Sequence, residues 1–175
     1  KYKQTTMVSD QPLWMRDQGL ALTGCGDKAL LDGSLTAFFS SRQCPGAAIR
    51  AAMDWALEQA RSRQPVVSGF HSPLEQSVLT VLLQARCPVV AVLARPVAGA
   101  RLPPEWAEPL AQGRMAVVSA AACSGRLTEA LAAQRNEWVA ALARQIVVAH
   151  ASPGGRLAVL CDEWTLAGRS VRRLG

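Results

Sequence analysis

The chain has 175 residues, half of them hydrophobic, and a formal net charge of +6. This length and composition fit one domain with a full apolar core and exclude general disorder. No apolar run reaches the roughly 20 residues of a transmembrane helix, so we expect no membrane partner. The N-terminus, KYKQTTMVSDQPLW, lacks the apolar core of a signal peptide. The positive charge favours anionic partners.

Five single cysteines are spread along the chain without a CxxC pair: Cys25, Cys44, Cys87, Cys123 and Cys161. An odd count without pairing argues against a disulfide framework and against a zinc knuckle. A reducing cytoplasm is the compartment that fits best. With two histidines and scattered cysteines, we expect no metal site.

Residues 1–34 are interpreted as an N-terminal lead-in that packs on a main domain of residues 35–175. Within the lead-in, residues 20–23 are expected to form a short strand and residues 24–26, Gly-Cys-Gly, a turn. Residues 27–31 fit one helical turn.

The stretch 35–57 predicts a strand, a turn and a helix in succession. Residues 35–39 form an apolar run, and residues 40–46 are polar and tight. The apolar face of the helix that follows is expected to consist of Ile49, Ala52, Met53, Ala56, Leu57 and Ala60, which recur at helical spacing. Pro45 suits the first helical position, where a missing N–H costs nothing. The start of this helix offers free N–H groups to an anion, with Arg42 just before it.

A second unit of the same kind follows. Residues 65–67 are expected to form a buried strand, and a helix then begins with Ser72 as N-cap, Pro73 at the first position and Glu75 closing a capping box. Residues 88–93, PVVAVL, predict the next strand. Successive strand–helix–strand units predict a three-layer α/β, Rossmann-like fold with a mostly parallel central sheet.

The rest of the chain continues this alternation. We expect a long connection over 94–113, with Trp106 as the tryptophan most exposed to solvent, and a small-residue loop over 120–125. A helix over 127–142 is expected to break near Arg135. The remaining predictions are strands over 115–119 and 146–149, a turn over 150–155, a helix ending near 168, and an edge strand or basic tail over 170–174.

Three turns follow strands and precede helices, at residues 40–46, 68–72 and 150–155. In a parallel sheet such turns gather at the carboxyl edge, where ligands bind. Their serines and glycines, with Arg42 and Arg135, predict a phosphate or nucleotide pocket. Ordinary connecting turns would look similar, and Arg135 could instead bond Glu75 or Glu137. His71 fits a general base and His150 a ligand. Each histidine fits equally well as a polar residue at the end of a strand, without a role in chemistry.

The segments LTAFFSSRQCPG, VVSGFHSPLEQSVLTVLLQARCPVVAVLARP and RNEWVAALARQIVVAHASPGG resemble, in this order, the motifs of the DprA/Smf DNA-processing proteins. The similarity covers about residues 20–170. It implies the extended Rossmann fold of the wider SLOG superfamily and binding of nucleic acid, chiefly single-stranded DNA, without catalysis or cofactor. The expected phosphate-binding residues are Ser41, Arg42, Ser68, Gly69, His71, Ser72, Arg135, Asn136, Pro153, Gly154 and Gly155.

The chain also departs from the family pattern, since Ser40 replaces a glycine expected before Ser41. A nucleotide sensor or a nucleotide-hydrolysing enzyme like the LOG phosphoribohydrolases is the alternative function. Residues 153–155 match the first part of the LOG motif PGGxGTxxE, but Cys161 stands at its glutamate. A third function is a scaffold that self-associates, for example as a homodimer, through a sheet edge or an exposed apolar helix.

Overall fold

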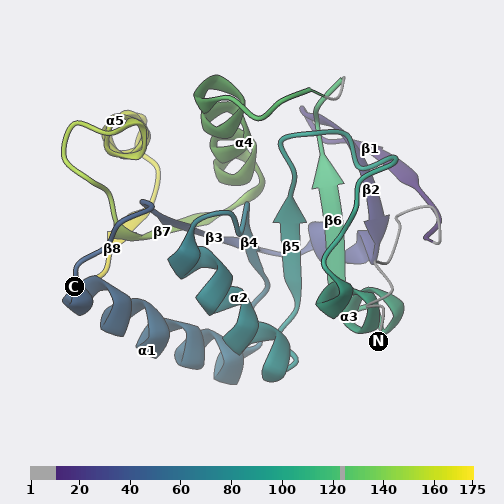
Figure 1. The fold of residues 1–175 in the computed structure, drawn as a ribbon, viewed down its shortest axis with the longest axis horizontal. Coiled ribbons are helices and arrows are strands. Elements are labelled where there is room, and N and C mark those ends of the chain that lie inside the picture. Colours follow the sequence, from purple (N-terminus) through teal and green to yellow (C-terminus); the bar gives the residue numbers. More distant parts are fainter. Residues whose placement is uncertain (1–10, 123–124) are drawn as a thin grey trace.

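The computed structural model describes residues 11–122 and 125–175, which are built around an eight-stranded sheet (Figure 1). Its strands are β1 (Trp14–Asp17), β2 (Ala21–Gly26), β3 (Thr36–Ser40), β4 (Val66–Ser68), β5 (Val89–Val92), β6 (Met115–Ser119), β7 (Gln145–His150) and β8 (Val171–Arg173). Their order across the sheet is β1-β2-β6-β5-β4-β3-β7-β8. All pairs among β3–β8 are parallel, whereas β1 and β2 run antiparallel at one edge.

Helices cover both faces of this sheet, which confirms the predicted three-layer α/β architecture. The helices are η2 (Lys28–Asp32), α1 (Gly46–Ser62), α2 (Pro73–Gln84), η3 (Pro104–Trp106), α3 (Ala107–Ala111), α4 (Glu129–Leu142) and α5 (Arg156–Leu166). Figure 1 shows α1 and α2 below the sheet, and α4 and α5 above it.

Two neighbouring phenylalanines of β3 anchor the two apolar layers. Side chains alternate along a strand, so Phe38 stacks on Trp55 of α1 at a ring distance of 4.9 Å. Phe39 faces the other way and meets Trp164 of α5 at 4.8 Å. These four aromatic side chains are buried, and they fix α1 and α5 on opposite sides of β3.

The strand order reverses at β3. From β3 the chain moves through β4 and β5 to β6, and it then returns to place β7 on the other side of β3. The helices that connect strands on one side of this reversal pack on one face of the sheet, and those on the other side pack on the opposite face. This arrangement opens a crevice at the carboxyl ends of β3 and β7. This edge is where the three predicted turns lie.

Helix α1 differs from the prediction in its start and in its buried face. It begins at Gly46, so Pro45 is the N-cap rather than the first helical residue. Trp55 is buried, whereas Ile49 and Leu57 are 44% and 48% exposed. The helix is rich in alanine, and alanines on several sides obscured which stripe faces the sheet.

Three other local predictions were wrong. The residues 24–26 expected to turn belong to β2, which pairs with β6. Trp106 is 8% exposed and packs in the core with Leu110. Helix α4 runs through Arg135 without a break. For residues 24–26, pairing with the distant strand β6 outweighed the local signal of a turn.

The thiols of Cys25, Cys44, Cys87 and Cys161 are free. Across residues 11–122 and 125–175, no helix combines the length and the apolar character that crossing a bilayer requires. The predictions made for residues 1–10, for Cys123 and for the centre of the loop 120–125 lie outside the described residues.

Candidate functional site

Three hollows along α4 contain residues of the predicted site. The first, which we call the arginine hollow, has a volume of about 370 Å³. It is lined by Ser40, Ser41, Arg42, His71, Ser72, Glu75, Glu129, Ala132, Ala133, Arg135, Asn136, Arg156 and Leu157. The turns after β3 and β4 therefore meet α4 and the start of α5 around one cavity, and Arg42 and Arg135 lie on its wall as predicted.

Arg135 is the most unusual residue of this hollow. It is only 6% exposed, and its Nε has no hydrogen-bond partner in the described part of the chain. Burial lowers the pKa of Arg135, and the charge of Glu75 raises it, but a guanidinium stays protonated in proteins. A cation buried without a close partner is costly, and the described residues offer Arg135 no ion pair that would offset this cost.

Gly69 leaves the space that Arg135 occupies. A Cβ at Gly69 would lie 2.5 Å from the Nε of Arg135, which is closer than real contacts allow, and 3.0 Å from its Cδ. Any larger residue would push the guanidinium away. The glycine after β4 therefore leaves room for an arginine of another element, and the phosphate contact expected of Gly69 stays a prediction.

Glu75 holds two of the turns together. Its Oε1 accepts hydrogen bonds from the N–H groups of His71 at 3.0 Å and Ser72 at 3.2 Å. Its Oε2 accepts a hydrogen bond from the N–H of Ser40 at 3.0 Å. Glu75 therefore connects the turn after β4 with the end of β3. Burial raises the pKa of Glu75, and these three N–H groups and Arg135 oppose that rise. The carboxylate thus fixes one wall of the arginine hollow.

Ser41 ties the turns on the two sides of the switch point. Its N–H donates to the carbonyl of His150 at 2.8 Å, and its Oγ accepts the N–H of Ser152 at 2.8 Å. Beside it, the hydroxyls of Ser40 and Ser72 lie 3.1 Å apart and share a hydrogen bond. These serines therefore use several of their hydrogen-bonding groups within the protein, where they hold the turns at the carboxyl edge of the sheet.

The predicted site residues fall into separate groups. Ser41, Arg42, His71, Ser72, Arg135 and Asn136 share the arginine hollow. A side hollow of about 290 Å³ contains Gly69, together with His71 and Arg135. Ser68 is fully buried, and its Oγ accepts the N–H of Phe70, so it forms the turn itself. Pro153 lines none of the three hollows.

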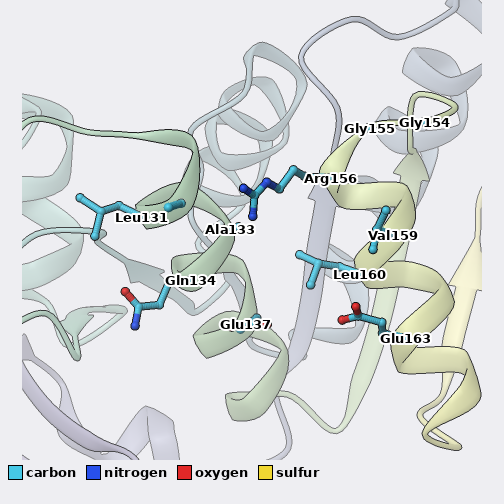
Figure 2. Close-up of a pocket in the computed structure, with 11 residues that line it drawn as sticks. Leu131, Ala133, Gln134, Glu137, Gly154, Gly155, Arg156, Val159, Leu160 and Glu163 are labelled. Atoms are coloured by element: carbon cyan, nitrogen blue, oxygen red, sulfur yellow. The ribbon is translucent and has the colours of Figure 1, made fainter.

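Gly154 and Gly155 line a third hollow, the helix groove between α4 and α5, which has a volume of about 620 Å³. Figure 2 shows Arg156, Leu160 and Glu163 extending from α5 toward α4. Arg156 lines both this groove and the arginine hollow. The prediction did not include it, although it directly follows the glycine turn in the sequence.

These features define an α/β protein with a Rossmann-like sheet and an arginine-lined hollow at its switch point. The chain belongs to the DNA recombination-mediator protein A family, whose model matches residues 8–158. This confirms the resemblance to the DprA proteins. No curated protein matches the chain.

Solved structures share the fold at low sequence identity. DNA processing protein A from Streptococcus pneumoniae is 19% identical, with a TM-score of 0.72 over 87% of this chain and 54% of that one. The Helicobacter pylori protein, solved for its single-stranded DNA binding mode, is 14% identical, with a TM-score of 0.74 over 99% and 82%. The molybdenum cofactor binding protein from Rippkaea orientalis is 8% identical, with a TM-score of 0.52 over 80% and 88%. The chain thus spans about half of the S. pneumoniae structure.

Proposed function

We propose that the chain binds single-stranded DNA by holding a backbone phosphate in the arginine hollow, between Arg42 and Arg135. The observation that carries this proposal is Arg135, a buried guanidinium without a hydrogen-bond partner for its Nε among the described residues. It lies on the wall of a hollow that exposed Arg42 also lines. Membership of the DNA recombination-mediator family and the DNA-binding H. pylori relative support nucleic acid as the ligand.

The chemistry of the two arginines suits a phosphate. A guanidinium presents parallel N–H donors that match two phosphate oxygens, and such charge-assisted bonds are roughly twice as strong as neutral ones. A phosphate beside Arg135 would also compensate the charge of a buried guanidinium. Binding therefore gains both hydrogen bonds and charge neutralisation.

Affinity for oligothymidylate is expected to fall steeply with salt, because bound phosphates release counterions. Each phosphate contact on a single strand contributes a slope of about −0.7 in log affinity against log salt concentration. Arg42→Ala should make the slope shallower by about that amount. Fluorescence anisotropy with labelled oligothymidylate measures it. Arg144→Ala, an exposed arginine before β7 and outside the hollow, is the matched control, and no binding at low salt would remove the proposal.

Oligothymidylate should bind more tightly as the pH falls, because His71 gains a proton. Burial and the charges of Arg135 and Arg42 lower the pKa of His71. A phosphate in the hollow opposes the two arginines and raises that pKa, so binding takes up a proton below about pH 6.5. Affinity should rise by up to about tenfold for each unit of that rise. His71→Gln should remove this dependence, and an unchanged pH profile would place the phosphate elsewhere.

We favour binding over the hydrolysis considered as the alternative. Cys161, at the position of the LOG glutamate, is buried, and Asp162 next to it pairs with Arg173 at 3.7 Å. Gly154 and Gly155 line the helix groove and not the arginine hollow. Incubation with nucleoside monophosphates tests this choice, since release of free base would favour an enzyme. A cytoplasmic location and a homodimer stay predictions, the latter testable by the mass in solution.

A further inference from the structure

The arginine hollow contains acidic as well as basic side chains. Three arginines line it, Arg42, Arg135 and Arg156, and so do two glutamates, Glu75 and Glu129. Glu75 is buried, and its oxygens accept backbone N–H groups. Glu129 is exposed, and the ion pairs of the described residues, Arg16–Asp32 and Arg173–Asp162, leave it unpaired. A free carboxylate on the wall of an anion site weakens binding in proportion to the charge of the anion.

The start of α4 sets the position of Glu129. The hydroxyl of Thr128 caps the helix by accepting the N–H of Leu131 at 3.2 Å. From Glu129, one helix face continues through Ala132, Ala133 and Asn136, which all line the hollow. With a rise of about 1.5 Å per residue, Glu129 lies about 9 Å along the axis from Arg135. The small side chains of Ala132 and Ala133 leave the space between Glu129 and Arg135 open.

Phosphates of a nucleic acid differ in charge by their place in the chain. An internal phosphodiester carries a single negative charge, because its one acidic proton is lost well below neutral pH. A terminal phosphate monoester has a second ionisation near pH 6 and carries close to two charges at neutral pH. Like charges on one site repel, so a carboxylate penalises the monoester more than the diester.

We propose that Glu129 is a specificity-determining residue that favours internal phosphodiesters of a strand over terminal phosphates and free nucleotides. This inference rests on the proposed function, and it separates that function from the nucleotide-sensor alternative. The arginines supply the attraction common to both ligand types. Glu129 supplies the repulsion that distinguishes them, as specificity often requires.

Glu129 also has an ordinary structural role, which the test must distinguish from an effect on ligand preference. An acidic residue in the first turn of a helix interacts favourably with the helix dipole. If that were its only role, Glu129→Gln would lower the melting temperature and leave ligand preference unchanged. Glu137→Gln is the matched control, since Glu137 is also exposed on α4 but lines the helix groove instead.

The experiment compares thymidine 5′-monophosphate with its methyl ester, two ligands that differ by one charge. Each competes with labelled oligothymidylate for the wild type, Glu129→Gln and Glu137→Gln. We expect Glu129→Gln to raise affinity for the monophosphate roughly two- to fivefold relative to the ester, and Glu137→Gln to leave the ratio unchanged. An unchanged ratio in Glu129→Gln, or equal changes in both variants, would overturn the inference. Absence of oligothymidylate binding to the wild type would instead overturn the proposed function.

Discussion

Replacing Arg42 or Arg135 by lysine is expected to weaken oligothymidylate binding while the fold survives. Lysine keeps the charge but cannot donate two parallel hydrogen bonds to one phosphate. Replacement of Arg42 by alanine should cost more, about 1.5–3 kcal/mol for a lost charge-assisted bond, or roughly ten- to more than a hundredfold in affinity. Anisotropy titrations at one low salt concentration give these values.

The double variant tests whether the two arginines serve one phosphate. Side chains that contact the same group are coupled, so the combined loss should be smaller than the sum of the single losses. Melting temperatures recorded in parallel separate binding from folding. If Arg135→Lys lowered the melting temperature and left affinity unchanged, Arg135 would be a structural residue and the pocket assignment would fall.

Glu75→Ala is expected to produce the largest loss of stability of any single change at the site. It removes the acceptor of three N–H groups, those of Ser40, His71 and Ser72. The bonds from Ser40 and Ser72 are buried, and the bond from His71 is partly buried. Each buried donor left without a partner costs about 1–3 kcal/mol, so we expect the free energy of unfolding to fall by at least about 2 kcal/mol. Urea denaturation measures this change.

Glu75→Gln should fall between the wild type and alanine, because an amide keeps one acceptor oxygen but presents a donor in place of the other. Gln84→Ala is the control, since Gln84 is an exposed residue of the same helix. A loss no greater in Glu75→Ala than in Gln84→Ala would show that the carboxylate does not hold the two turns.

The sequence predicted the elements whose signals are local. The capping box of Ser72 and Glu75 is present at the start of α2, and the apolar run before Ser40 is β3. Arg42 follows β3 and lies at the carboxyl edge of the sheet, as the geometry of a parallel sheet predicts. Arg135 lies within α4, and sheet geometry alone does not determine that its side chain reaches the same hollow.

What the sequence did not predict depends on contacts between distant segments. Strand β1 was missed, and it is held by its pairing with β2. The bond from Glu75 to the N–H of Ser40 spans 35 positions, and no spacing rule encodes it. The separation of Gly154 from the arginine hollow is set by how α5 packs against α4. Sequence periodicity describes faces of elements and not the distances between them.

A crystal structure of the protein with a short oligothymidylate would show directly where the phosphates bind. We expect an internal phosphate in the arginine hollow, within hydrogen-bond distance of the guanidinium groups of Arg42 and Arg135. DNA bound elsewhere, for example along the basic residues of β8 or in the helix groove, with no phosphate between these two arginines, would contradict it.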